Sequence, residues 1–346
     1  MGLAGGIEAP GGRATSGMGG ARRVIRKLLR FPASSVIIAT VVLILIIGGL
    51  HPRFLGMMQL MDMLQSAVYT GVMAMGLAYV IAMRDIDLSP GAIFALSLIG
   101  AALLMRMGMN PWLAMVCGLL IGVACGLFNA AVVAYLHIPT IITTLATLSM
   151  YPGLARILAG GQVVVGLPVN SSFFTVLGGT VGGFPVAAIV MVVVAIPVGI
   201  ALHHTPWGYR VLALGSNPDA AKFSGISERR VRTQVLMLIG LLSGVAGVLG
   251  LAYFTSGNST INSGNLSLTA IAAAVIGGTP LRGGSASILG ALVGAVLLSV
   301  VNSGLPFFGV QAVWTEFVVG VVIVVAVGFD SVIRFQQRRN DADEVG

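Results

Sequence analysis

Long stretches without any charged side chain dominate this sequence. No Asp, Glu, Lys or Arg occurs in the 49 residues between Arg106 and Arg156, in the 53 residues between Arg156 and Arg210, or in the 49 residues between Arg232 and Arg282. About 20 apolar residues cross the hydrocarbon core of a bilayer as a helix, so each stretch is long enough for two spans and a connection. The chain is therefore predicted to cross a membrane several times.

The scarcity of charge also excludes an ordinary soluble protein. Charged residues make up 9% of the chain, against roughly a quarter in soluble domains, and these are too few to cover a water-facing surface. Strands of a membrane β-barrel alternate polar and apolar side chains, whereas the run 36–47 is almost continuously apolar. Helices are the remaining way to satisfy the backbone inside lipid. The predicted fold class is therefore all-α and polytopic.

About ten membrane-spanning helices are predicted within residues 33–330. Residues 1–32 are predicted to form a disordered basic tail, and residues 331–346 a second tail after the last span. The spans are placed by their apolar runs, at residues 33–50, 62–83, 88–105, 112–136, 139–159, 184–203, 233–255, 267–278, 287–305 and 312–329.

The basic residues predict the orientation of these spans. If the N-terminus is inside, 16 of the 19 Lys and Arg residues fall on inner segments, and only Arg53, Arg106 and Arg156 fall on outer ones. Inner loops of membrane proteins carry such an excess, so both termini are predicted to be cytoplasmic. The formal charge of +8 then reports orientation, with anionic lipid headgroups as counter-ions and no nucleic acid implied.

Small residues recur at helical spacing within the predicted spans. Gly118, Gly122 and Gly126 fall four residues apart in the span 112–136, and Ala130 continues the row. Such a ridge lets a second backbone approach closely. We predict that it packs against another helix of the same bundle, in preference to a dedicated dimer seam.

The sequence lacks the motifs of a motor or an enzyme. The two lysines, Lys27 and Lys222, are not preceded by the glycine that an ATP-binding P-loop requires. No H-E-x-x-H or G-x-S-x-G motif occurs, so no catalytic residue, metal or cofactor is predicted. No ionisable residue falls at the centre of a predicted span, which argues against an ion-coupled carrier. Sodium coupling through carbonyl and hydroxyl groups remains open.

The longest inner loop, residues 204–232, carries the signals of a short helix. Asn217 can cap a helix that starts at Pro218, and Gly225 can end it. Ser227 can then cap the next helix. The short helix presents small and apolar residues, which suit either a position on the lipid surface or the docking of a soluble partner; these residues are Ala220, Ala221 and Phe223.

Four ordered motifs resemble one family. The run 85–91, with Asp85, Asp87, Ser89 and Gly91, resembles the I-D-L-S-x-G signature of permease subunits in bacterial ABC importers for monosaccharides. That group includes ribose, xylose and arabinose permeases with their rhamnose and autoinducer relatives. Residues 128–147, 213–226 and 272–284 are similar to three further stretches of the family, in the same order. The resemblance covers roughly residues 33–330.

The sequence departs from the family pattern at two positions of the first motif. Arg84 stands where a Gly commonly precedes the motif, and Pro90 replaces the usual Val. Both changes stiffen or charge the turn before the third predicted span. Details of gating and of substrate choice are therefore not transferred from the family.

The resemblance implies a division of labour between several chains. This chain would be an inner-membrane permease that pairs with a second permease, docks two cytoplasmic ATP-binding subunits and receives a sugar from a periplasmic binding protein. The second permease could be an identical or a related chain. Docking would fall on the short helix of the inner loop, through Asn217, Pro218, Ala220, Ala221, Phe223 and Gly225.

A path for a neutral sugar is expected to offer hydroxyl and amide groups instead of charges. Each candidate could equally be satisfied inside the bundle; the candidates are Asn129, Thr143, Thr147, Asn258, Asn262 and Asn302. The alternatives to a sugar permease are an ion-coupled secondary carrier, or an ABC permease for a nucleoside or a branched-chain amino acid. The sequence does not specify the sugar.

Overall fold

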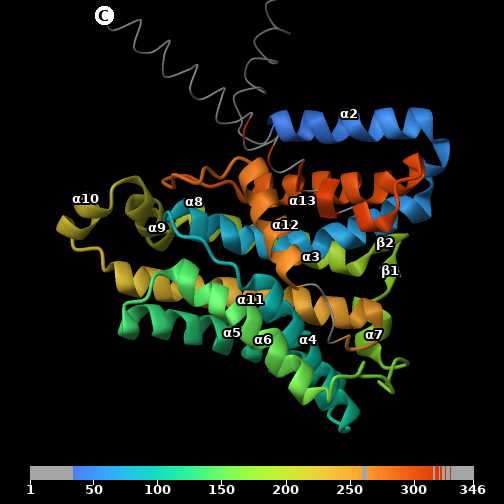
Figure 1. Ribbon diagram of the computed structural model, residues 1–346, viewed down its shortest axis with the longest axis horizontal. Helices are drawn as coiled ribbons and strands as arrows, with labels where there is room; N and C mark the ends of the chain where they lie inside the picture. Colours follow the sequence, from blue (N-terminus) through green and yellow to red (C-terminus); the bar gives the residue numbers. More distant parts are fainter. Residues whose placement is uncertain are drawn as a thin grey trace, which may run out of the picture.

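The computed structural model of the chain is a bundle of helices. It describes residues 34–258, residues 263–314 and some positions between 316 and 328. Both predicted tails, 1–32 and 331–346, lie outside the described residues, as do 8 of the 18 positions of the predicted span 312–329. The described helices run mostly along one direction, with the two ends of the bundle at the left and right of Figure 1.

Among the residues that the structure describes, six helices are long and apolar enough to cross a membrane. They are α3 (Met57–Ala82), α5 (Pro111–Leu136), α6 (Thr140–Leu158), α8 (Val186–His204), α11 (Glu228–Phe254), and α13 (Ile288–Gly304) with its continuation η2 (Leu305–Phe308). Three shorter apolar helices accompany them, namely α2 (Ser34–Leu50), α4 (Pro90–Arg106) and α12 (Ser263–Ile276). These nine helices coincide with the first nine predicted spans, to within about five residues at each end.

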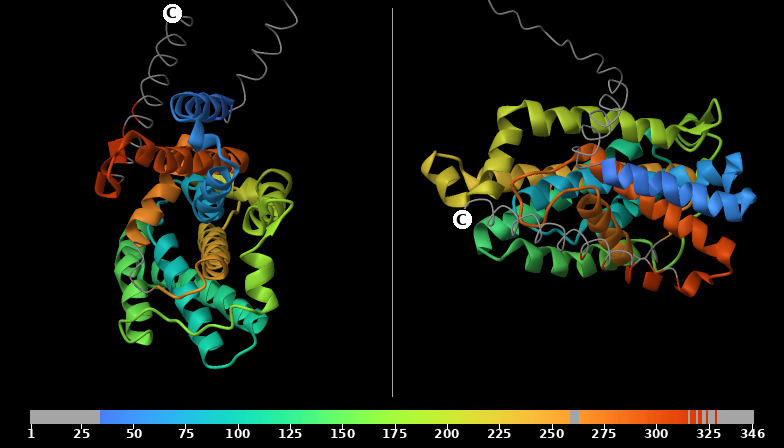
Figure 2. Two further views of the ribbon diagram at one scale, coloured as in Figure 1. Left: turned by 90° about the vertical axis from the view of Figure 1, so that its right-hand side faces the viewer. Right: turned by 90° about the horizontal axis from the view of Figure 1, so that it is seen from above.

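Helices α3 and α11 form the centre of the bundle. Of the most apolar 18 residues of α3, 89% are buried, against 28% in α8. Helix α3 packs against α8, α11, α12 and α13, and α11 packs against α4 and α5. Helix α2 lies outside this group, over α13 (Figure 2). The outer helices expose apolar side chains, as expected of surfaces that face lipid or another membrane protein.

The predicted glycine ridge packs inside the bundle. A Cβ atom built on Gly122 would lie within 2.4 Å of the Gly240 carbonyl oxygen of α11, and Gly126 is similarly close to the backbone at Leu236. No side chain fits at these contacts, so only glycine allows the two helices to approach this closely. The prediction of packing within the bundle is confirmed for this ridge.

Two short helices and a hairpin were not predicted. Between α6 and α8 lie α7 (Ser172–Leu177) and a small antiparallel hairpin of β1 (Thr180–Val181) and β2 (Phe184–Pro185). After α8, the predicted loop 204–232 is largely helical, because α9 (Pro206–Ser216) precedes the predicted helix α10 (Pro218–Phe223). Helices α9 and α10 lie at one end of the bundle, and α7 lies at the other (Figure 1). Two further short helices are η1 (Pro52–Leu55) and η3 (Ala312–Trp314).

Candidate functional site

The motif residues Asp87 and Ser89 form a buried polar chain at the start of α4. Ser89 donates two hydrogen bonds to Asp87 Oδ1, from its backbone N–H at 2.7 Å and from Oγ at 2.6 Å. Asn129 Nδ2 of α5 donates to Ser89 Oγ at 2.9 Å, and the Tyr151 hydroxyl of α6 donates to Asn129 Oδ1 at 2.8 Å. The chain therefore links the start of α4 to both α5 and α6.

The same turn is held by backbone contacts on its other side. The N–H of Leu88 donates to Thr144 Oγ1 of α6 at 3.1 Å, and the N–H of Gly91 donates to Ser267 Oγ of α12 at 2.8 Å. A Cβ atom on Gly91 would collide with the Ser263 carbonyl oxygen. The glycine of the motif is thus required by the close approach of α12.

The Asp87 carboxyl lies in this connecting turn, and no basic side chain within the described residues forms an ion pair with it. Its side chain is fully buried, and no hydrogen-bond partner for Oδ2 occurs among the described residues. Burial raises the pKa of Asp87 to about 6, and the hydrogen bonds from Ser89 oppose the rise. The turn therefore connects α4 to its neighbouring helices, and it contains a carboxyl group whose charged form is disfavoured by burial.

Arg84 occupies a backbone conformation that favours glycine. Its φ angle is +64°, a left-handed value that costs a non-glycine residue free energy. The Arg84 side chain donates from Nη2 to the Ser216 carbonyl oxygen of α9 at 2.8 Å, which helps to offset that cost. The departure from the family pattern at this position therefore adds a contact between the end of α3 and the end of α9.

Pro90 is the first residue of α4, directly after the N-cap Ser89. Its fixed φ angle suits the first turn of a helix, where the missing N–H has no intrahelical partner. The substitution at this position stiffens the turn without breaking the helix.

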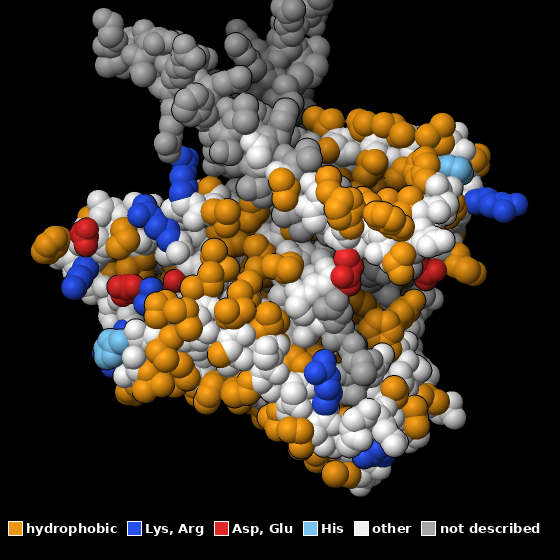
Figure 3. Space-filling view, viewed as in Figure 1, with side chains coloured by type: hydrophobic (Ala, Val, Ile, Leu, Met, Phe, Trp, Pro, Cys, Tyr) orange, Lys and Arg blue, Asp and Glu red, His pale blue; other side chains and the backbone are white. Residues whose placement is uncertain are grey.

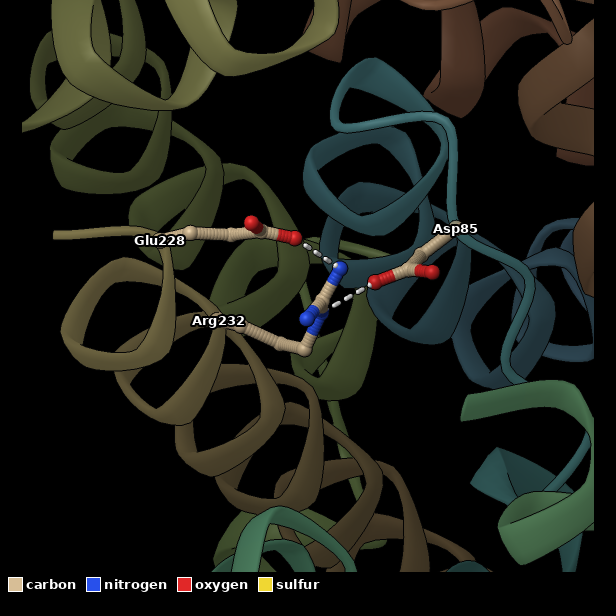
Figure 4. A network of polar contacts seen from close by, with 3 residues as sticks. All are labelled: Asp85, Glu228 and Arg232. Atoms are coloured by element: carbon tan, nitrogen blue, oxygen red, sulfur yellow. Dashed lines mark hydrogen bonds and ion pairs between the residues drawn. The ribbon is translucent and has the colours of Figure 1, made fainter. Parts of the chain in front are cut away.

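A second polar network joins the turn to α11. Arg232 Nε lies 2.7 Å from Asp85 Oδ2, and Arg232 Nη2 lies 2.7 Å from Glu228 Oε1 (Figure 4). All three side chains are partly exposed to solvent, so each pair contributes only modestly to stability. The network fixes the position of the first motif residue, Asp85, relative to the start of α11.

The predicted caps of α10 are present. Asn217 Oδ1 accepts a hydrogen bond from the Ala220 N–H at 3.1 Å, and Pro218 is the first helical residue. Gly225 follows the helix with a φ angle of +79°, and Ser227 Oγ accepts from the Arg230 N–H at 3.4 Å, at the start of α11. Local sequence thus determines where this short helix starts and ends.

The small and apolar residues predicted for α10 differ in their exposure in the structure. Ala221 is buried against the chain, Ala220 is exposed, and Phe223 is exposed over 92% of its area. Helix α10 has six residues and is too short to cross a membrane. A fully exposed phenylalanine is unusual on such a helix. Figure 3 shows basic side chains gathered at this end of the molecule, while apolar side chains cover the middle.

Helix α9 connects α10 firmly to the central helix α3. The Trp207 ring stacks on Tyr79 with centroids 5.1 Å apart, and the Tyr79 hydroxyl donates to the Val198 carbonyl oxygen at 2.5 Å. A Cβ atom on Gly215 would collide with the Ala82 carbonyl oxygen. Displacement of α10 is therefore expected to be transmitted to the end of α3.

The six path candidates do not meet at one place. Asn129 belongs to the polar chain described above, and its amide is satisfied within the bundle. Thr143 and Thr147 are buried on α6; Thr147 Oγ1 donates to the Thr144 carbonyl oxygen at 3.3 Å, whereas Thr143 Oγ1 has no hydrogen-bond partner among the described residues. Asn258 is exposed beyond α11, and Asn262 lies outside the described residues.

Asn302, the last candidate, lies on α13 and is half-buried. Its Oδ1 atom is buried without a hydrogen-bond partner in the described part of the chain. It shares no hydrogen bond with the α6 threonines. The structure therefore separates the candidates into an α6 group, an α13 position and the loop before α12.

An open cleft lies beside the two motif networks. Its volume is about 440 Å³, and it is bounded by the turn after α3, the turn between α5 and α6, and α11. Charged, hydroxyl and apolar side chains share the lining, which includes Arg84, Asp85, His137, Thr140, Ile141 and Arg232. The cleft is large enough for a small polar molecule, and its lining includes one hydroxyl residue, Thr140, which lies on α6 close in sequence to the path candidates Thr143 and Thr147.

Several residues of these networks were not identified from sequence. Tyr151 completes the chain from Asp87, and Ser267 binds the motif glycine across 176 positions of sequence. The tyrosine within the predicted span 139–159 was a usable signal for Tyr151, since a buried hydroxyl needs a partner. Ser267 carried no such signal, because its partner is a backbone N–H that sequence does not distinguish.

The sequence pattern of one family, described as "Branched-chain amino acid transport system / permease component", matches residues 59–327. That range includes both motif networks, α9 and α10.

Individual relatives are similar over most of their length. The ribose import permease protein RbsC of Bacillus subtilis is 36% identical over 289 residues, which cover 84% of this chain and 89% of the relative. RbsC of Escherichia coli K12 is 35% identical over 297 residues, covering 85% and 92%. The autoinducer 2 import system permease protein LsrD of Klebsiella pneumoniae is 32% identical over 290 residues, covering 82% and 86%.

Proposed function

This chain belongs to the family of branched-chain amino acid transport system permease components, and we propose that it is the transmembrane subunit of an ABC importer for a monosaccharide. It is a multi-pass protein of the bacterial inner (plasma) membrane. The similar ribose and autoinducer 2 permeases support a sugar as substrate. A branched-chain amino acid carries two charges that call for ionic partners, and the buried hydroxyl groups of α6 supply none.

The exposed phenylalanine of α10 is the observation that carries the proposal. Phe223 is 92% exposed on a helix with defined caps, at the end of the bundle where basic side chains gather. A groove on a soluble partner would bury this ring and remove its area from water, a contribution of about 1.5–3 kcal/mol. We propose that α10 is the coupling helix, with Asn217, Pro218, Ala220, Ala221 and Gly225 shaping it and Phe223 as its apolar anchor.

Transmission to the membrane part follows from the contacts of α9. Nucleotide-driven movement of an ATP-binding subunit would shift α10, and the Trp207–Tyr79 stack and the Arg84–Ser216 hydrogen bond would carry that shift to α3. The turn that starts with Asp85 lies next to this contact. The motif residues Asp85, Asp87 and Ser89 thereby couple movement of α3 to the position of α4.

The proposed path uses uncharged polar groups. The α6 hydroxyl groups of Thr143 and Thr147, the amides of Asn129 and Asn302, and the loop that contains Asn258 and Asn262 remain its candidates. Thr143 Oγ1 and Asn302 Oδ1 are the strongest of these, because both are buried and lack a hydrogen-bond partner among the described residues. A sugar hydroxyl could satisfy either atom.

Partner chains complete the proposed assembly. A second permease, identical or related, would cover part of the exposed apolar surface, a periplasmic binding protein would deliver the sugar at the α7 end, and ATP-binding subunits would dock at the α10 end. Both termini would be cytoplasmic in this arrangement. No nucleic acid is involved, and this chain contributes no covalent chemistry.

Uptake by intact cells tests the proposal. Labelled pentoses, hexoses, deoxysugars and the furanosyl autoinducer are offered to cells with the chain, without it, and with its Asn258→Ala variant. We expect uptake of one sugar class to require the chain and to stop when ATP is depleted at a constant ion gradient. Uptake that survives ATP depletion and stops when ion gradients collapse would establish an ion-coupled carrier instead. Unchanged uptake in the Asn258→Ala variant would remove the loop before α12 from the path.

A further inference from the structure

A groove lined by two arginines, Arg229 and Arg230, runs between α5 and α11 at the end of the bundle that carries α10. Its volume is about 470 Å³. Residues of α5 form its apolar wall and residues of α11 its polar wall; the argument uses Leu127, Ala131, Tyr135, Arg229, Arg230 and Gln234. We call it the arginine groove. It is separate from the Asp87 network and from α10.

Close packing of small residues creates this groove. Helices α5 and α11 touch through Gly122 and Gly126, and the same face of α5 continues toward the groove with alanines. Ala130, Ala131 and Ala134 leave open space where larger side chains would fill it. The groove is therefore a feature of the backbone arrangement and does not depend on the rotamer of one long side chain.

The two arginines of the groove have no anionic partner in the described part of the chain. Arg232, one turn further along α11, forms ion pairs with both neighbouring carboxylates, Asp85 and Glu228. No other carboxylate within the described residues lies at ion-pair distance from Arg229 or Arg230. Positive side chains in the first turn of a helix are disfavoured by the helix dipole, so this placement costs free energy unless an anion offsets it.

The neighbouring surface specifies the kind of anion. The Arg229 guanidinium lies 4.3 Å from the centroid of the Tyr135 ring, which keeps it against α5. From that point an exposed apolar stripe follows α5 through Leu127, Leu120 and Val116. An arginine pair at one end of a membrane-facing apolar stripe matches a molecule with a charged head and a hydrocarbon tail.

We propose that the arginine groove binds an anionic phospholipid, with its phosphate on Arg229 and Arg230 and an acyl chain along the exposed stripe of α5. A second copy of this chain is a poorer occupant, because it would bring the same positive groove and a net charge of +8. A soluble partner is poorer too, since it would have to cover Leu127 and Leu120 on a long apolar helix. The proposal goes beyond the transport function and stands without it.

Native mass spectrometry of the purified full-length chain measures the binding. The protein is titrated with phosphatidylglycerol and, separately, with phosphatidylcholine. The test variant is the Arg229→Gln, Arg230→Gln double substitution. The matched control is Arg210→Gln, Arg282→Gln, which removes the same charge from two exposed residues outside the groove. Ala131→Phe fills the groove and leaves every charge in place.

We expect phosphatidylglycerol to bind the unmodified chain and the control pair more tightly than phosphatidylcholine does. The Arg229, Arg230 double variant should bind phosphatidylglycerol roughly thirty-fold more weakly, on the basis of about fivefold for each basic residue near an anionic lipid. Ala131→Phe should weaken it as well. Equal affinity of the two lipids, or equal loss in the test and control pairs, would overturn the proposal.

A crosslinking experiment distinguishes a bound lipid from a second copy of this chain in the arginine groove. Gln234→Cys places a thiol at the rim of the groove, and the native Cys117 and Cys125 give the background in the unmodified chain. We expect no crosslinked pair above that background in membranes. Efficient crosslinking of two chains through position 234 would show that a second permease covers the groove, and would overturn the proposal.

Discussion

Helices α7 and α10 are equally short and use their phenylalanines in opposite ways. Each has six residues, and they lie at opposite ends of the bundle (Figure 1). Helix α7 buries Phe173 and Phe174 completely or nearly so, and the Phe173 ring lies edge-on to Trp112 with centroids 5.8 Å apart. Helix α10 exposes its only phenylalanine. One helix is anchored by aromatic packing, and the other keeps its aromatic side chain outside.

This difference between the two helices indicates that α10 can bind a partner through its exposed ring. A helix of this length is unstable in isolation and needs tertiary contacts or caps. The phenylalanines of α7 supply those contacts, whereas α10 is held by the Asn217 cap, by buried Ala221 and by its connection to α9. Phe223 therefore contributes little to the fold and is available to a partner. Substitutions in the two helices are therefore expected to have different effects.

The largest effect is expected for Phe223→Asp. Because the ring makes no buried contact in this chain, the variant should fold and insert normally. Placing a carboxylate at the centre of an apolar contact should abolish sugar uptake and transport-coupled ATP hydrolysis. Uptake and ATPase activity are measured together with the amount of permease in the membrane. Phe223→Leu is the matched control and should retain most activity; normal coupling in the Asp variant would remove the docking role.

A different kind of loss is expected for Phe173→Ala in α7. Truncation of a fully buried phenylalanine costs about 3–5 kcal/mol of stability. The purified variant should therefore unfold at a lower temperature than the unmodified chain, whereas Phe223→Ala should unfold at nearly the same temperature. Thermal unfolding in detergent compares the two variants directly. Equal destabilisation by both would contradict the division between an anchored and a free aromatic.

The close contact between α5 and α11 allows a similar comparison of a buried and a less restricted position in the long helices. Gly122→Ala places a Cβ atom against the Gly240 carbonyl oxygen, and such overpacking costs about 1–3 kcal/mol. Gly199→Ala, at a half-buried position of α8, places a Cβ atom that meets no atom within 4 Å and should be neutral or slightly stabilising. Thermal unfolding measures both variants. A neutral Gly122→Ala would mean that the two helices are not in close contact.

The smallest effects are expected at the N-caps of the two short helices. Asn217 Oδ1 accepts from the Ala220 N–H, whereas Ser171 makes no capping hydrogen bond to α7. Asn217→Ala should weaken α10 by about 1 kcal/mol and reduce uptake partially, and Ser171→Ala should change neither stability nor uptake measurably. Amide hydrogen exchange in residues 218–223 reports the local effect. Unchanged exchange in Asn217→Ala would show that the cap does not hold α10.

Features encoded by neighbouring residues were predictable from the sequence. The caps of α10 depend on Asn217, Pro218 and Gly225 within nine positions, and the glycine ridge of α5 needs only its own spacing. The helices at the first nine predicted spans follow from apolar runs in the same way, six of them long enough to cross a membrane, whereas the total of about ten spans stays a prediction. Each of these features is local, so one segment of sequence is enough to reveal it.

Features that depend on distant partners were not predictable. Helix α9 falls within the predicted inner loop 204–232, yet its Gly215 is required by the close approach of the α3 backbone and its Trp207 stacks on Tyr79. Asn129 is a path candidate because it carries an amide, and the sequence did not reveal its partners on α4 and α6, which are 40 and 22 positions away. Burial of these polar groups is decided by tertiary packing, which a single sequence does not display.

Reconstituted transport tests the central claim that this chain is a path without its own motor. Purified permease is placed in liposomes with enclosed ATP, either alone or with its cognate ATP-binding subunits, and binding protein loaded with labelled sugar is added outside. We expect accumulation only when the ATP-binding subunits are present, and none when Phe223→Asp replaces the unmodified chain. Accumulation of the sugar against its gradient by the permease alone would contradict the account.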